Sequence, residues 1–136
     1  MQNAETLVYK VLIKDMVLIN LLGGKKKVGT CEWNRIYNSA FAPNSDEYPR
    51  ITMFEVRNGD AEPADDKPQF SDVNIRIDLW TKDETKIFDI SKQIKKLLEN
   101  SFLCKVTPLE KSTEPDTLVH HKSLELKMLL EQESDT

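Results

Sequence analysis

The sequence offers two cysteines and two histidines as the side chains best suited to covalent or metal chemistry. Cys31 and Cys104 lie far apart, and no metal-binding motif has that spacing. His120 and His121 are neighbours in an alternating segment, where side chains project to opposite faces, so one ion cannot take both. Neither cysteine carries the local signature of a thiol enzyme. We therefore expect no catalytic residue, no metal and no cofactor. A small thiol enzyme that pairs a cysteine with a histidine is kept as an alternative.

A basic segment, Gly24-Lys-Lys-Lys-Val-Gly-Thr30, resembles a phosphate-binding loop in outline. A true loop of this kind places Lys and then Ser or Thr directly after the second glycine, between a strand and a helix. Here a threonine takes the lysine position, and the segment follows an expected helix. We interpret it as a solvated loop. Point charges suffice for non-specific binding, so a nucleic-acid-binding module is a further alternative, and the candidate contacts for phosphate or a partner are Lys25, Lys26 and Lys27.

An acidic stretch follows at Asn58 to Pro68, with two prolines and no periodicity. It is too long for a hairpin turn, and long loops in compact domains are usually functional or disordered. We expect a long polar loop over residues 58–69 that is mobile in the isolated subunit. Its candidate functional residues are Asp60, Glu62, Asp65 and Asp66. The competing interpretation is a solvated hairpin loop without a function.

The elements that must position these residues are clearest between Val73 and Asn100. Alternation of apolar and polar residues predicts a half-solvated strand, whose inward residues are Val73, Ile75, Ile77 and Leu79. Helical spacing then gives one apolar face, made of Ile87, Ile90, Ile94, Leu97 and Leu98. Thr81 and Glu84 stand at capping-box spacing, which predicts the start of the helix.

The remaining segments predict a second helix and further strands. They are a helix from about Asn3 to Leu22 that stops at Gly23-Gly24; a short strand at Trp33–Tyr37; a strand at Arg50–Arg57 with Ile51, Met53 and Val56 inward; a short strand at Cys104–Leu109; a polar turn at Glu110–Asp116; a last strand at Thr117–Leu130; and a flexible acidic tail at 131–136. The order predicts an α+β fold: an antiparallel or mixed β-sheet with an N-terminal helix and a second amphipathic helix packed on it.

Length and charge set limits on the function. The 136 residues fit a single α+β domain spanning 1–136, and the net charge of −4 argues against a dedicated nucleic-acid binder. No basic signal-peptide region opens the sequence, and no apolar run reaches the ~18 residues of a membrane span. We expect a cytoplasmic chain with reduced cysteines, a structural disulfide being the alternative.

Several segments in this order resemble the tail-completion, or tail-terminator, proteins of long-tailed phages and prophages, also described as tail-to-head joining proteins. The resemblance covers about residues 3 to 130. It is carried by the N-terminal helix, Arg35-Ile36-Tyr37, Ala42-Pro43, Tyr48-Pro49-Arg50-Ile51, and Ile75-Arg-Ile-Asp-Leu-Trp80 before a helix and a final strand pair. One departure is the stretch Asn38–Phe41, which lacks the Pro-Gly turn expected after Arg35-Ile36-Tyr37.

The resemblance implies a structural subunit without catalytic residues, which forms a homo-oligomeric, hexameric ring in the virion tail after assembly in the host cytoplasm. The implied partners are other copies of the chain, the tail tube protein, the head connector protein and DNA in transit, with no membrane. The acidic loop would then face the ring's opening. Sheet edges without an obvious guard could supply the subunit contact, because one repeated heterologous contact closes a ring. A head–tail connector stopper or adaptor is the neighbouring alternative.

Overall fold

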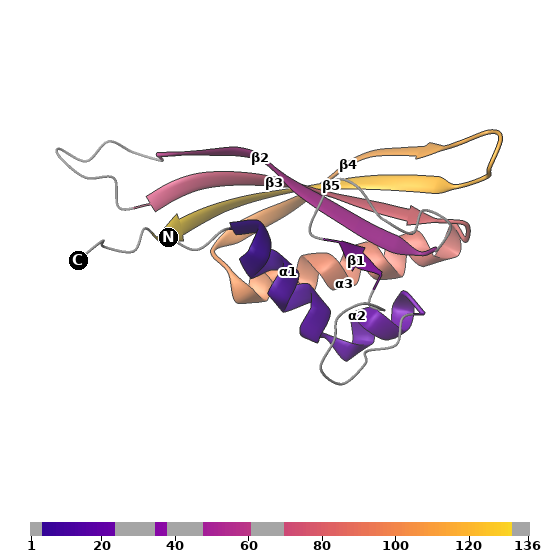
Figure 1. Ribbon diagram of the computed structural model, residues 1–136, viewed down its shortest axis with the longest axis horizontal. Helices are drawn as coiled ribbons and strands as arrows, with labels where there is room; N and C mark the ends of the chain where they lie inside the picture. Colours follow the sequence, from indigo (N-terminus) through magenta and orange to yellow (C-terminus); the bar gives the residue numbers. More distant parts are fainter. Residues whose placement is uncertain (1–3, 24–34, 38–47, 61–69, 132–136) are drawn as a thin grey trace.

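The structure, a computed structural model, describes residues 4–23, 35–37, 48–60 and 70–131. In chain order the elements are α1 (Ala4–Lys14), α2 (Met16–Leu21), β1 (Ile36–Tyr37), β2 (Arg50–Asp60), β3 (Phe70–Thr81), α3 (Thr85–Ser101), β4 (Cys104–Thr113) and β5 (His120–Glu131). The three helices lie together on one face of a twisted sheet, and no described element covers its other face (Figure 1). The expected α+β fold is confirmed.

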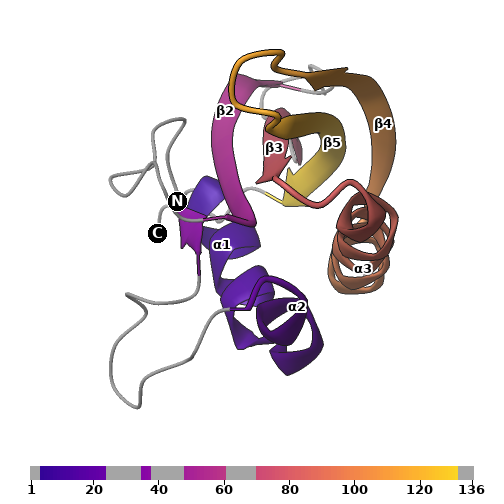
Figure 2. The same ribbon diagram turned by 90° about the vertical axis from the view of Figure 1, so that its right-hand side faces the viewer.

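The described strands form one five-stranded sheet in the order β1-β2-β3-β5-β4. The short β1 runs parallel to β2, and every other pair is antiparallel, so the sheet is mixed. β3 occupies the centre and pairs along its whole length with β5, from Phe70 opposite Glu131 to Thr81 opposite His120. Viewed end on, α1 and α2 lie under the β2 side of the sheet and α3 lies under the β4 side (Figure 2).

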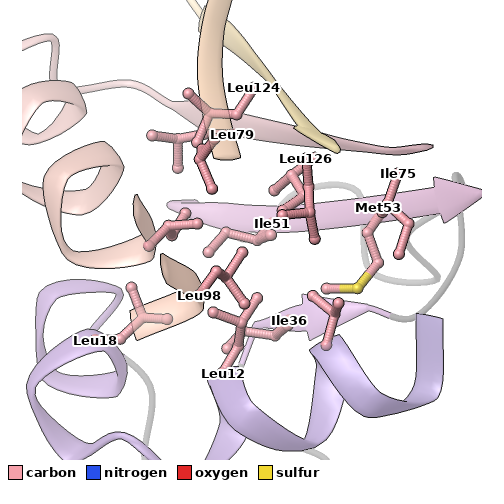
Figure 3. Close-up of a cluster of buried hydrophobic side chains, with 14 of the residues drawn as sticks. Leu12, Leu18, Ile36, Ile51, Met53, Ile75, Leu79, Leu98, Leu124 and Leu126 are labelled. Atoms are coloured by element: carbon pink, nitrogen blue, oxygen red, sulfur yellow. The ribbon is translucent and has the colours of Figure 1, made fainter. Parts of the chain in front are cut away.

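The core lies between the sheet and the helices, where each element buries its one apolar face. On β3 the four predicted inward residues have no exposed surface: Val73, Ile75, Ile77 and Leu79. They share a cluster with the apolar face of α3, in which Ile87, Ile90, Ile94 and Leu98 are buried and Leu97 is partly buried. Figure 3 shows how side chains from α1, α2, β1 and the sheet close the other half of the cluster. The predicted strand–helix unit is therefore confirmed.

The expected single N-terminal helix is wrong, because the chain breaks at Asp15. This residue has an extended backbone, and its carboxylate accepts a hydrogen bond from the amide of Leu18 at 2.9 Å, so it caps α2. The same carboxylate accepts a second bond from Gln93 Nε2 at 2.8 Å, which joins α2 to α3. An N-cap side chain that satisfies an amide of the first turn competes with helix continuation. The predicted stop is confirmed at Gly23, which has φ +70.

The predicted capping box at the start of α3 is also wrong. The hydroxyl of Thr81 accepts from the amide of Asp83 at 3.0 Å. Asp83 in turn accepts from the amide of Thr85 at 3.0 Å and from its hydroxyl at 2.6 Å. Glu84 makes no side-chain cap and instead forms an ion pair with Lys111 of β4. The hydrogen bonds of Thr81 and Asp83 thus form two overlapping side-chain turns, where the sequence predicted one reciprocal box between Thr81 and Glu84. Thr81 itself is the last residue of β3.

Several strand boundaries differ from the prediction. Residues 58–60 belong to β2 and pair with β3, so the predicted loop 58–69 begins too early, and residues 61–69 lie outside the described part. Val56 is 59% exposed, not inward, because a register shift falls between Glu55 and Arg57. β4 continues through most of the expected polar turn after a second shift between Pro108 and Lys111. β5 begins at His120, not at Thr117. Its last residue is Glu131, which the prediction assigned to the acidic tail.

Candidate assembly surfaces

The structure describes only one of the charged residues that the sequence analysis selected as functional candidates. Asp60 is the last residue of β2, opposite Ser71 of β3, so its assignment to a loop is corrected to a strand end. The other members of the acidic set, Glu62, Asp65 and Asp66, lie outside the described residues, as do Lys25, Lys26 and Lys27. Their predicted roles stay predictions. Asp60 nevertheless places the acidic segment at the end of the β2–β3 hairpin.

A polar cluster that the sequence reasoning missed lies on the sheet face opposite the helices. Its centre is Asp78, only 7% exposed although it sits on the open face. Asp78 Oδ1 lies 2.8 Å from His121 Nε2 and accepts hydrogen bonds from Ser123 Oγ at 2.8 Å and Arg76 Nε at 3.2 Å. Arg76 Nη2 also donates to Ser123 Oγ at 2.9 Å. The register brings the cluster together, because Asp78 of β3 pairs directly with Ser123 of β5.

The three residue types of a hydrolytic triad are present in this cluster, but their arrangement is not that of a triad. In a triad the histidine bridges, with one ring nitrogen toward the carboxylate and the other toward the hydroxyl. Here Asp78 and Ser123 both approach the same nitrogen, His121 Nε2, the serine at 3.3 Å. Ser123 is also only 1% exposed. The cluster therefore satisfies buried polar groups and joins two strands, and it presents no activated nucleophile.

Aromatic and cationic side chains extend this cluster across the sheet. The ring of His121 stacks on Trp80, with 3.9 Å between the ring centroids and 4° between the planes. Trp80 Nε1 donates to Thr52 Oγ1 of β2 at 3.3 Å. On the far side of Trp80, the Arg50 guanidinium lies 5.7 Å from the Trp80 ring and 4.6 Å from that of Tyr48. These contacts hold the open face of β2, β3 and β5 in one arrangement.

Cys104 does not have the properties of a catalytic thiol. Burial, with a smaller contribution from the charge of Glu99, raises the pKa of Cys104 to about 11. Its sulfur also contacts the carbonyl oxygen of Leu98 at 3.2 Å. The reactive species of such enzymes is the thiolate, which a pKa of about 11 makes scarce at neutral pH. Cys104 is a free cysteine in the described part of the structure. Cys31 lies outside the described residues.

The two histidines have separate partners. His120 Nδ1 lies 2.8 Å from Thr113 Oγ1, at the start of the β4–β5 hairpin, whereas His121 belongs to the cluster around Asp78. Within the described ranges, no group of three or more His, Cys, Asp or Glu side chains could hold a metal ion. No helix of that part of the chain is both long and apolar enough to cross a membrane.

A groove of about 490 Å³ runs between α3 and the outer strands β4 and β5. Its floor is apolar and buried, formed by Ile87, Val106 and Leu124. Phe88 stands at its edge and is 71% exposed. Four lysines line it against one glutamate, Glu84, and they are Lys92, Lys95, Lys111 and Lys122. The groove therefore combines an apolar floor with a positively charged rim.

The edge strands of the sheet have features that hinder pairing with a further strand, and the sequence analysis did not predict them. β4, at one edge, contains Pro108 and an irregular register up to Lys111, and it exposes Lys105. Proline, irregular register and lysine are features that discourage a further strand from pairing. At the other edge β1 covers part of β2, and the amide of Glu55 beyond it donates to the carboxylate of Glu5 in α1. These features argue against the expectation that open edges supply the subunit contact, which stays a prediction.

The fold has a counterpart among solved structures. A chain in the structure described as "Virion of native gene transfer agent (GTA) particle" matches with a TM-score of 0.62 and 15% sequence identity, over 95% of this chain and 95% of that one. No protein-family model matches the chain, and no curated protein matches it. At this identity the likeness concerns the fold, which is shared over nearly the whole of both chains.

Proposed function

We propose that this chain is a structural subunit of a phage-type particle. The observation that carries the proposal is the shared fold with a chain of a gene transfer agent virion, over 95% of each chain. A likeness of that extent is not confined to a common supersecondary motif. The described residues also favour a structural role, because the cluster at Asp78 lacks triad geometry and the pKa of Cys104 is raised.

Within that class, the proposed role is tail completion. The chain assembles into a homo-oligomeric ring, a hexamer, which caps the tail tube and joins it to the head connector. The sequence resemblance to tail-terminator proteins supports this role. The alternative within the same class is a stopper or adaptor of the head–tail connector, which would bind the connector and not the tail tube.

One experiment separates the two roles. The purified chain is mixed with tail tubes, and separately with head connectors, from the particle that encodes it, and both mixtures are imaged by electron microscopy. Tail completion predicts rings at the end of the tail tube and no rings on connectors alone. Rings on isolated connectors, with bare tail tubes, would assign the chain to the connector instead.

The acidic segment at the β2–β3 hairpin is proposed to face the opening of the ring. Carboxylates on the wall would repel DNA phosphates, so that DNA passes without binding. Replacing Asp60, Glu62, Asp65 and Asp66 by the matching amides should leave ring formation intact and lower infectivity. Unchanged infectivity with normal tails would identify the segment as a solvated loop.

A further inference from the structure

The β4–β5 hairpin ends in an ordered tip that presents an exposed leucine. Leu118 is 65% exposed and has φ +56, a conformation that is unfavourable for a leucine. Two backbone bonds of 2.9 Å hold it there, from the Leu118 amide to the Glu114 carbonyl and from the Glu114 amide to the Val119 carbonyl. The tip projects past the start of α3 (Figure 1). A strained, exposed apolar residue on a turn held by its own hydrogen bonds is the kind of outlier that points to a functional contact.

The charged residues of the tip are all negative. Glu114 and Asp116 precede Leu118 in the turn, both are exposed, and the tip from 114 to 118 carries no lysine or arginine. The hydroxyl of Thr117 donates to Glu114 Oε2 at 2.8 Å, which fixes one of the carboxylates. The tip thus presents an exposed leucine directly after two acidic residues.

The groove between α3 and the outer strands has the complementary chemistry. Its floor is apolar. Of its four lysines, Lys111 pairs with Glu84 and Lys95 lies 4.0 Å from Glu99, so the excess positive charge of the rim comes from Lys92 and Lys122. Lys92 Nζ lies over the ring of the exposed Phe88, 5.9 Å from its centroid, so a cation and an aromatic ring lie together at the rim. An acidic turn that ends in an exposed leucine therefore matches both the floor and the rim.

The tip cannot reach the groove of its own chain. Lys111 and Lys122 line the groove from the two strands that carry the tip; Lys111 lies three residues before the tip and Lys122 four residues after it. At ~3.3 Å per residue the tip lies on the order of 10 Å beyond them, and it would have to fold back by breaking the hairpin. A docking partner of this chemistry would therefore come from another molecule, and every copy carries both surfaces.

We propose that the Leu118 tip of one copy docks in the α3–β4–β5 groove of the next copy, with Glu114 and Asp116 beside the lysines. The contact joins two different surfaces, so it is heterologous and repeats from copy to copy, as a ring requires. It uses neither guarded sheet edge. The proposal rests on the proposed function, because it names the contact between the subunits of that ring. Its test uses the isolated chain and requires no tail tube.

The test measures the self-association of the whole chain by sedimentation and light scattering, up to about millimolar concentration. Leu118→Asn removes the apolar side chain and keeps a residue that tolerates positive φ. Phe88→Gln alters the groove at an exposed helical position. Each should raise the dissociation constant at least about 10-fold, as expected for the centre of an interface. Leu103→Asn is the matched control, since Leu103 is also 71% exposed but lies outside both surfaces, and it should change the constant less than about 2-fold.

Mixing the two weakened variants tests the direction of the contact. Each mixed pair keeps one intact tip and one intact groove, so the mixture should stop at a dimer. Reversing both partners, with Glu114 and Asp116 to Lys together with Lys92 and Lys95 to Glu, should restore the oligomers that either reversal alone removes.

Three results would overturn the proposal. They are a wild-type chain that stays monomeric throughout, one that stops at a dimer, and rings that form equally well with Leu118→Asn, each with unchanged circular dichroism. Rings that survive Leu118→Asn and still cap tail tubes would refute this contact and leave the proposed function standing. Oligomers that depend on the tip but do not bind tail tubes would support this contact and refute the proposed function.

Discussion

Truncation of Ile77 to alanine tests the packing of the central strand. Ile77 has no exposed surface, and its partners across the sheet are Met53 on β2 and Leu124 on β5, which are 0% and 2% exposed. The substitution removes three carbon atoms, worth about 2.4 kcal/mol at ~0.8 kcal/mol for each buried methylene. Neighbours fixed in a paired sheet have little freedom to fill the space, so a cavity term adds to this loss. We expect a total near 4 kcal/mol.

The assay is urea denaturation of the wild type and the variant, with thermal melting as a second measurement. Scaled to 136 residues, the usual unfolding entropy of ~2.1 cal/mol/K per residue gives about 0.29 kcal/mol/K. A loss of 4 kcal/mol therefore lowers the melting temperature by about 14 °C. Ile77→Val should lose about 1 kcal/mol, because it removes a single methylene.

Arg76→Ala is the control on the opposite face of the same strand. The Arg76 side chain is 40% exposed and lies 3.2 Å from Asp78. Exposure screens this ion pair, and Asp78 keeps His121 and Ser123 as partners, so we expect a loss of about 1 kcal/mol. Equal losses for the two alanine variants, or a loss below about 1.5 kcal/mol for Ile77→Ala, would refute the assignment of Ile77 to a tightly packed core.

Three further predictions follow from single contacts. In a Cys31→Ser background at pH 7, Cys104 should react with iodoacetamide about 300-fold more slowly than an ordinary thiol, because a pKa of about 11 leaves that much less thiolate than a pKa of 8.5. Asp15→Ala should destabilise the fold by about 1–2 kcal/mol in urea and Asp15→Asn by less, because asparagine keeps the cap of α2. Hydrogen bonds from Thr85 lower the pKa of Asp83, so the stabilisation that Asp83 provides is complete above its unfolded value near 3.8 and is lost as the pH falls through the lower folded value; Asp83→Asn should flatten that acid limb of the unfolding free energy.

The parts of the fold that the sequence predicts are those in which one element has a single apolar face. Alternation over Val73–Leu79 and helical spacing over Ile87–Leu98 each define such a face, and burial of both requires that they meet. Competition between a side chain and the backbone for the same amide group is harder to predict from the sequence. The apolar stripe of the N-terminal segment continues through Asp15, so its pattern did not reveal that the Asp15 carboxylate takes the Leu18 amide and ends α1.

The candidate surfaces were not predictable, because they depend on register. Asp78 and Ser123 are 45 residues apart and meet only because β3 and β5 pair as they do. Both stand at polar positions of alternating strands, which is the one signal that could have nominated them. The register shift after Pro108 is similar, since the residue pattern of β4 does not reveal it. The groove requires the position of α3 against the outer strands, which only the packed fold supplies.

The guarded edges bear on how such a subunit could assemble. The irregular register of β4 and the Glu55–Glu5 contact beside β2 discourage strand addition at these edges, so we expect contacts between copies to use preformed side-chain surfaces. The tip at Leu118 is held by its own hydrogen bonds and the groove is lined by regular elements, so little conformational freedom would be lost on contact. A small preformed contact is weak when made once. In a closed ring every copy makes it twice, and a tail tube that holds the copies side by side raises their effective concentration, so a weakly associating chain becomes a stable cap where the tube ends.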